Sequence, residues 1–332
     1  MNTTHILETN EKPVEAIRKF LAALWIETNL QGILALTFQD ETAQIQHRLL
    51  QSPEELAALN PFLPFVPMNS AKIVTQFAAQ HPTGRFGAIL RPCEARALFY
   101  NARFSFKNRH RWLLIGVDCL ASYPIQDLEW RTQKAGGMEP LVRETLRFAR
   151  QGGIAPYRYR SACQMCIPTA PQYVDINISL IGLPIRRFIL IEIKRKEIAD
   201  RLRIASFTSG IAPYGLLIQH QAALSRLARS HDNTHTRLVN SLPAELPARP
   251  DELVAYLKNC TPCQKCLEAC PIYAGELANQ GNGEDVASLE ARRWLASCVM
   301  CGQCEQACPR QLALTAIHGR ISQMLAESLL AA

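Results

Sequence analysis

The chain has 332 residues, which is enough for two domains, and 48% of them are hydrophobic while 20% are charged. This composition supports a packed core and excludes a wholly disordered protein. The longest apolar runs, such as residues 33–36, are far shorter than the roughly 20 residues of a transmembrane helix, so we expect no membrane span. The first residues show no basic start followed by an apolar stretch, so we expect a cytoplasmic protein.

The net charge of +7 is distributed unevenly along the chain. Residues 251–332 carry six basic and nine acidic side chains, so residues 1–250 hold the positive excess. This imbalance favours docking of the two parts on each other, or a basic face that meets an acidic partner. No short run of Lys and Arg alternates with aromatic residues, so nucleic-acid binding is not the expected role.

The first part of the chain alternates between helix-like and strand-like segments. Residues 14–30 have apolar side chains at helical spacing, and 33–38 form a short apolar run typical of a buried strand. Further helices are expected from residue 52, over 70–80 and over 95–102, with strands over 86–90, 112–117, 174–180 and 187–193. Because strands and helices alternate, we predict that residues 1–240 form an α/β domain with a mainly parallel sheet.

Three prolines within ten residues mark a linker over residues 241–250. Beyond it, residues 251–332 combine short helical segments with dense cysteine motifs. We predict a small, mostly α-helical, ferredoxin-like domain for this part.

The chain contains 12 cysteines, and in a reducing compartment so many thiols indicate metal binding rather than disulfides. Eight of them form the motif CxxCxxCxxxCP, which occurs once over residues 260–271 and again over 298–309. Three thiolates at this spacing can surround one face of an iron–sulfur cube, and the fourth cysteine of each motif ligates the other cluster in two-cluster ferredoxins.

The motifs therefore predict two [4Fe–4S] clusters with crossed ligands. One cluster is assigned Cys260, Cys263, Cys266 and Cys308, and the other Cys298, Cys301, Cys304 and Cys270. Zinc also binds sets of four thiolates, but its sites usually pair two CxxC units and rarely show three cysteines in series followed by xxxCP.

The remaining cysteines lie near the ends of predicted strands. Cys93 follows the strand over 86–90, Cys119 follows the strand over 112–117, and Cys163 and Cys166 form a CxxC unit. Because the ends of parallel strands meet at one edge of a sheet, these thiols could converge on a third cluster. Two alternatives remain open at this point, namely inert buried cysteines and a redox-active CxxC pair.

The segments around these four cysteines resemble a known family in their residues and order. The segments are 91–94 (RPCE), the stretch around Cys119, CQMC over 163–166 and VDINI over 174–178. Over about residues 70–200 they are similar to the β subunits of deazaflavin-coenzyme-reducing hydrogenases and dehydrogenases, including formate dehydrogenase β subunits. The resemblance implies that Cys93, Cys119, Cys163 and Cys166 hold a third [4Fe–4S] cluster.

Members of this family commonly bind FAD near that cluster and exchange a hydride with the deazaflavin coenzyme. Where they carry DISVGxxG, this chain has Ser179 in place of the first glycine and keeps Gly182. The side chain of a serine there could obstruct a flavin phosphate. The resemblance makes FAD a candidate cofactor, with Gly182 as its one candidate binding residue.

Taken together, these features predict an iron–sulfur electron-transfer subunit of a multi-subunit redox complex of the hydrogenase, formate dehydrogenase or heterodisulfide reductase type. One alternative is a flavin-containing oxidoreductase subunit that couples hydride transfer to the clusters. An alternative of another class is an iron–sulfur sensor or regulator. The pair His231 and His235 has the i, i+4 spacing of metal ligands, but in its polar surroundings we interpret it as a solvent-exposed part of a helix.

Overall fold

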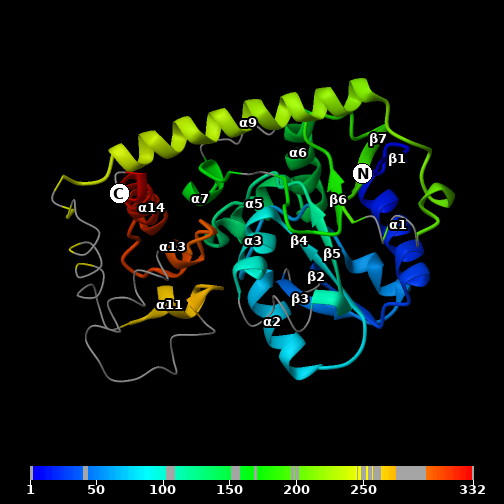
Figure 1. Cartoon of the computed structure of the whole chain (residues 1–332), viewed down its shortest axis with the longest axis horizontal. Coiled ribbons are helices and arrows are strands. Elements are labelled where there is room, and N and C mark those ends of the chain that lie inside the picture. The colour runs from blue at the N-terminus through cyan, green and yellow to red at the C-terminus, as the bar shows by residue number, and fades with distance from the viewer. Residues whose placement is uncertain are drawn as a thin grey trace.

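A seven-stranded mixed sheet organises the first part of the chain in this computed structural model (Figure 1). The structure describes residues 3–39, 44–101, 109–150, 158–167, 170–195, 198, 202–244, 246–247, 252, 256, 263–273 and 297–330. The strand order is β1-β7-β6-β5-β4-β2-β3. The strands are β1 (Thr3–Glu8), β2 (Gly32–Gln39), β3 (Gln44–Leu50), β4 (Phe86–Leu90), β5 (Trp112–Val117), β6 (Ile176–Ser179) and β7 (Phe188–Ile193).

The centre of the sheet is parallel and its margins are antiparallel. Strands β2, β4, β5 and β6 run in the same direction, whereas β3, β7 and β1 pair antiparallel with their neighbours. The prediction of an α/β domain is confirmed, and the parallel arrangement holds for the four central strands. Their residues are buried on both faces, which is why these segments are continuous apolar runs.

Helices cover both faces of the sheet. On one face, Ile33 and Ile115 share a buried cluster with side chains of α1 (Pro13–Thr28) and α6 (Met138–Arg150). On the other face, Leu114 packs with α2 (Ser70–Gln80) and α3 (Pro92–Tyr100). Adjacent strand residues therefore point into different clusters, as the alternation of a strand requires. The remaining regular elements of this part are α5 (Leu128–Ala135), α7 (Ser161–Gln164) and the 3₁₀ helices η1 (Pro53–Ala58), η2 (Arg109–Arg111), η3 (Ile125–Asp127) and η4 (Ile204–Ser206).

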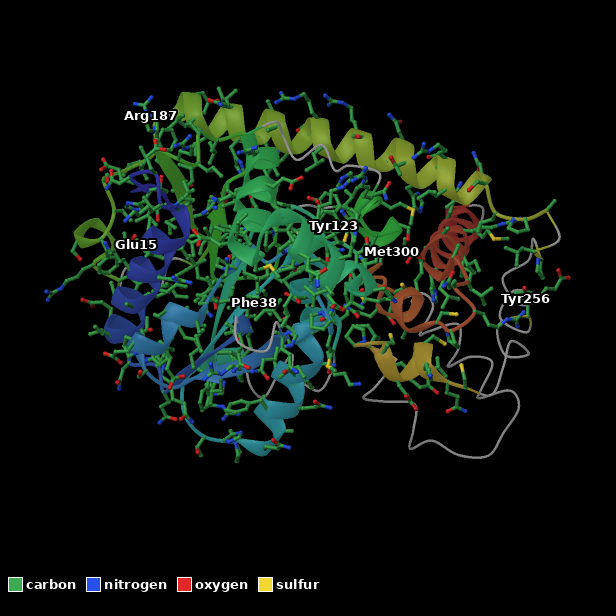
Figure 2. The ribbon with its side chains drawn as sticks, turned by 180° about the vertical axis from the view of Figure 1, so that it is seen from behind. Glu15, Phe38, Tyr123, Arg187, Tyr256 and Met300 are labelled. Atoms are coloured by element: carbon green, nitrogen blue, oxygen red, sulfur yellow. The ribbon has the colours of Figure 1, made fainter. Side chains whose placement is uncertain are left out.

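The described residues of the C-terminal part form three helices. They are α11 (Lys265–Ala269), α13 (Gln303–Ala307) and α14 (Leu314–Leu330). Helix α9 (Tyr214–Asn240) runs along the whole molecule, from the margin that contains β1 and β7 to α14 (Figure 1). Seen from behind, Met300 lies where the two parts meet (Figure 2). Within the described ranges, no helix has both the length and the apolar character needed to cross a bilayer.

Candidate iron–sulfur sites

Cys93 and Cys119 lie at the carboxyl edge of the parallel strands. Cys93 occupies the first turn of α3, directly after β4 and after a proline at the first helical position. Cys119 follows β5, and the carboxylate of the preceding residue, Asp118, accepts hydrogen bonds from the backbone N–H groups of Leu180 and Ile181 at 3.0 and 3.2 Å. These bonds fix the loop after β5 against the end of β6. Ligand sites of parallel sheets form at this edge.

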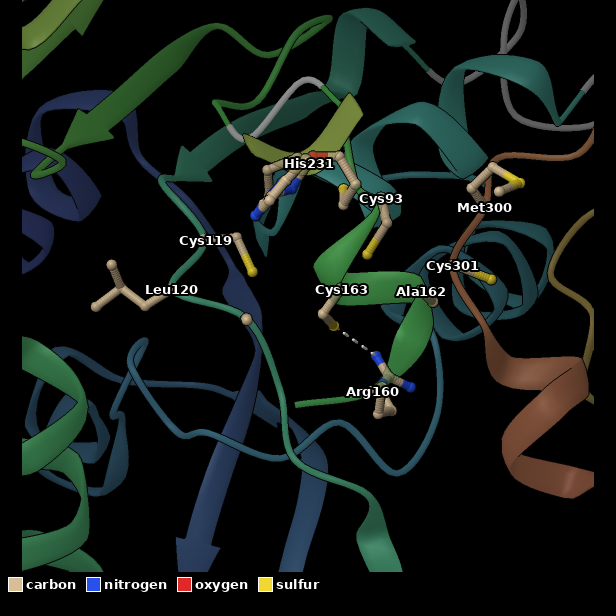
Figure 3. Close-up of a pocket in the computed structure, with 12 residues that line it drawn as sticks. Cys93, Cys119, Leu120, Arg160, Ala162, Cys163, His231, Met300 and Cys301 are labelled. Carbon is tan, nitrogen blue, oxygen red and sulfur yellow. Dashed lines mark hydrogen bonds between the residues drawn. The ribbon is translucent and has the colours of Figure 1, made fainter. Parts of the chain in front are cut away.

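Cys163 and Cys166 approach the same edge from helix α7. The N-cap residue of α7, Arg160, donates its backbone N–H to Ser122 O at 2.9 Å, which ties α7 to the loop that follows Cys119. All four cysteines of this first group, Cys93, Cys119, Cys163 and Cys166, line one cavity of about 450 Å³, its open mouth included (Figure 3). The structure thus brings together side chains that are up to 73 positions apart in the sequence.

Two buried arginines contact sulfur atoms of this first group. Nη2 of Arg96 donates to Cys166 Sγ at 3.4 Å, and Nη2 of Arg160 donates to Cys163 Sγ at 3.7 Å. Arg96 and Arg160 are each less than 10% exposed. Burial alone would lower the pKa of each guanidinium, but the neighbouring cysteine thiolates raise it above its ordinary value. Both arginines are therefore permanent positive charges beside the cavity.

A histidine from α9 covers the same cavity. His231 is 6% exposed, and its Nδ1–H donates to the carbonyl of Cys166 at 2.7 Å (Figure 3). Burial lowers the pKa of His231, so the ring is neutral at neutral pH. The interpretation of His231 as part of a solvent-exposed helix segment is wrong, because α9 lies across the sheet edge and its inner face is buried.

A second cavity contains the second group of cysteines, Cys270, Cys298, Cys301 and Cys304. It measures about 380 Å³, its opening included, and these four are the residues that the motif spacing assigns to one cluster. Met300 and Cys301 line both this cavity and the first one. The two groups are therefore separated by a single stretch of backbone.

The third group is described in part. Cys263, Cys266 and Cys308 lie close enough for the charge on Cys263 and on Cys308 to raise the pKa of Cys266, after the larger effect of burial. Cys263 is exposed, whereas Cys266 and Cys308 are half-buried. Cys260, the fourth predicted member, lies outside the described residues.

The two cysteine motifs have the same local conformation. Gln264 and Gly302, which each follow the second cysteine of their motif, are left-handed, with φ of 50° and 69°. Each precedes a five-residue helix that ends at the fourth cysteine, Cys270 or Cys308, in extended backbone. The helix holds the third cysteine, and the extended residue after it turns the fourth away from the first three. This geometry agrees with ligands that cross between the two groups.

The second motif is held against the α/β domain by side-chain hydrogen bonds. Nε2 of Gln306 donates to Val66 O at 3.2 Å, and the carboxylate of Glu305 accepts from Ser161 Oγ and from the backbone N–H of Thr315. Val299 and Cys301 belong to the buried cluster formed by α2 and α3. An added Cβ on Gly302 would lie 2.4 Å from the Cβ of Ala162, so only glycine permits this contact.

The buried thiols must lose their protons before they can bind a metal. Burial raises the pKa of Cys119 and Cys298 to about 12 and that of Cys301 to about 11. Such thiols are protonated at neutral pH, and metal binding must displace these protons. Among the described residues, no three side chains of His, Cys, Asp or Glu are grouped so that they could hold a single metal ion. The CxxCxxCxxxCP spacing of the second and third groups fits [4Fe–4S] clusters better than single zinc ions.

Gly182 makes close contacts within the chain. Its φ is +78°, and an added Cβ would lie 2.3 Å from the Cβ of Ala223 in α9. Its backbone N–H donates to Ala149 O, and its carbonyl accepts from Gln219 Nε2, both at 2.7 Å. Ser179 is buried and donates to Glu192 at 2.6 Å. The polar groups at Gly182 are thus satisfied within the chain and do not fit a flavin phosphate site.

The motif and the fold define a protein with an α/β domain and a C-terminal iron–sulfur domain of the ferredoxin type. Residues 259–313 match the family described as 4Fe-4S dicluster domain. Among solved structures, one chain of the F420-reducing [NiFe] hydrogenase complex from Methanosarcina barkeri, a xenon derivative, is similar with a TM-score of 0.51 at 10% sequence identity. The match covers 72% of this chain and 91% of that chain, and at this identity it concerns the fold. A search of curated proteins finds no significant match.

Proposed function

We propose that this chain is an electron-transfer subunit that relays electrons through three [4Fe–4S] clusters within a multi-subunit redox complex of the hydrogenase, formate dehydrogenase or heterodisulfide reductase type. The observation that carries the proposal is the arrangement of the cysteines. The first and second groups share Met300 and Cys301 in their walls, and the crossed fourth cysteines link the second group to the third. Three cluster sites in a row give a path through the molecule.

Bound [4Fe–4S] clusters would supply one-electron transfer, and the protein's part is to hold them close together and exclude water. The cysteines supply the ligands, and the buried cluster of α2 and α3, which includes Val299 and Cys301, keeps solvent from the junction of the first two groups. Cys263 is exposed, so the third group lies nearest to the surface among the described cysteines of the C-terminal part. This exposure suits exchange of electrons with a partner subunit.

The proposal is tested on protein purified and handled without oxygen. Three clusters require about twelve iron and twelve sulfide per chain, whereas two require about eight of each. Cys163→Ser should remove about four iron from the first group, and Cys263→Ser about four from the third, with the other signals retained. A colourless protein that is folded but contains no iron would overturn the proposal, as would zinc in place of iron.

A flavoprotein remains the alternative function, and the visible spectrum separates the two. Clusters alone give a broad absorption, while FAD adds resolved flavin peaks and is released on denaturation. The closed contacts of Gly182 argue against a flavin at that residue, and release of stoichiometric FAD would favour the alternative.

A further inference from the structure

The first cysteine group differs from the second in the positive charge that contacts its sulfur atoms. Arg96 and Arg160 donate to Cys166 and Cys163 of the first group. In the second group, the sulfur atoms of Cys298 and Cys301 accept instead from the backbone N–H groups of Met300 and Gln303, which carry no net charge. Both arginines also attract the second group electrostatically, Arg96 at Cys298 and Arg160 at Cys301, but among the described contacts they hydrogen-bond to sulfur atoms only in the first group.

Arg160 lacks any other counter-charge in the part of the chain that the structure describes. Its Nε and Nη1 are buried without a hydrogen-bond partner there, and no described carboxylate forms an ion pair with it. Burial of a guanidinium without an anion is strongly unfavourable, because the charge loses its hydration. A [4Fe–4S] cluster with four thiolates carries net negative charge and additional sulfide acceptors, so it supplies what this side chain lacks.

Arg96 joins the first two sites. The same Nη2 atom that donates to Cys166 Sγ also donates to the carbonyl of Val299, between Cys298 and Met300, at 3.0 Å. The positive charge of Arg96 therefore lies between the two cavities and is bonded to a ligand of the first.

Two carboxylates also lie near the first group. The charge of Glu94 adds to the larger effect of burial in raising the pKa of Cys93, and Asp118 precedes Cys119. Each is engaged elsewhere: Glu94 accepts from Ser70 Oγ at 2.8 Å and from the backbone N–H of Arg91 at 2.8 Å, and Asp118 accepts from two backbone amides and lies 3.9 Å from His220. These partners of the two carboxylates are backbone and side-chain groups, whereas both arginines hydrogen-bond to sulfur atoms.

From this asymmetry we propose that Arg96 and Arg160 are tuning residues that raise the reduction potential of the first cluster above that of the second. The inference rests on the proposed function, since it requires both clusters. A reduced cluster carries one more negative charge, and a guanidinium within hydrogen-bond distance and shielded from water stabilises that form more strongly than the oxidised form. Electrons in the relay consequently collect at the first group, next to the edge of the sheet.

The test is a redox titration followed by electron paramagnetic resonance on the full chain, with iron measured in each sample. Arg160→Gln and Arg96→Gln should shift the midpoint potential of the first cluster to more negative values. Arg160→Lys, which keeps the positive charge, should leave this midpoint potential close to that of the unmodified protein. The exposed Arg143 on α6 gives the control, Arg143→Gln, which should change no midpoint. The first cluster is identified by the signal that Cys163→Ser removes.

The outcomes separate this inference from the proposed function. Absence of iron from the unmodified protein defeats the proposed function. Full iron content with unchanged midpoints in both Gln variants overturns the tuning role. If a Gln variant fails to assemble the cluster, the midpoint potentials of the first and second clusters are compared in the unmodified protein. The inference requires the first cluster to have the less negative potential, and the reverse order overturns it.

Discussion

The two cysteine motifs share one backbone conformation, but their surroundings differ. The motif over 298–308 is buried against α2, α3 and α7, and its left-handed residue is a glycine because Ala162 leaves no room for a side chain. The motif over 263–270 has an exposed cysteine and places Gln264 at the equivalent left-handed position. The two motifs thus share one backbone conformation, while contact with the α/β domain restricts the residue at the left-handed position in one of them.

The largest expected difference between the motifs concerns electron flow. Cys301→Ser should remove about four iron and interrupt passage between the first and third groups, because Cys301 lines both inner cavities. Cys263→Ser should also remove about four iron, but reduction of the first cluster by a small chemical reductant should persist. Stopped-flow absorbance measures both. Equal rates of reduction of the first cluster in the two variants would contradict a linear path through the second cluster.

The second-largest effect is expected for the dependence of the rate of cluster assembly on pH. Burial raises the pKa of Cys298 to about 12 and that of Cys301 to about 11, so these thiols are protonated at neutral pH, and raising the pH increases their thiolate fraction. Reconstitution of the second cluster in iron-free Cys263→Ser should therefore accelerate by roughly tenfold per pH unit between pH 7 and 9. Absorbance at increasing pH follows it, and a rate independent of pH would show that deprotonation does not limit assembly.

The left-handed residues offer a matched pair of substitutions. Gly302→Ala should destabilise the protein by roughly 1–3 kcal/mol, because its Cβ collides with Ala162 and φ is +69°. Gln264→Gly should stabilise it by up to about 1 kcal/mol, since glycine adopts this conformation without steric cost. Thermal unfolding of fully loaded protein gives both values. Changes in stability of equal size in the two variants would show that both motifs are equally constrained at this position.

The smallest effect is expected at the exposed motif's own contact with the α/β domain. Nζ of Lys72 donates to the carbonyl of Glu268 at 2.7 Å in an exposed position. Lys72→Met should cost about 0.5 kcal/mol, as solvent-exposed hydrogen bonds contribute little. Denaturant unfolding measures this change in the free energy of unfolding. A loss above about 2 kcal/mol would mean that the exposed motif depends on this contact as strongly as the buried motif depends on Gly302.

The elements that sequence predicts well are those with strong local patterns. The parallel strands β2, β4 and β5 are continuous apolar runs, and the sequence also predicts strands where β6 and β7 lie, which pair with each other. The marginal strands β1 and β3 are absent from the predicted elements, because β3 is mostly polar and neither shows a clear period of two. Their strand structure depends on pairing with distant partners.

Within the candidate sites, spacing alone indicates the cysteines but not the groups around them. The assignment of Cys270 with Cys298, Cys301 and Cys304 follows from the motif, and the structure places these four around one cavity. Arg96 and Arg160 carry no such signal, since an arginine in an amphipathic segment is usually solvated, and the spacing of His231 and His235 does not show that His231 faces the first cavity. Only the tertiary structure shows that Arg96 reaches a sulfur atom 70 positions away.

Helix α9 also carries a constraint that no single contact reveals. His220 and His231 are eleven residues apart, about three turns, so both project from the same side of the helix. The first donates to Ile181 O beside Gly182, and the second to Cys166 O beside the first cavity. A shift of α9 along its axis would break both bonds at once. The fit of this helix over a glycine turn and its cover of the first cavity about 16 Å away along the axis are thus a single mechanical property of the protein.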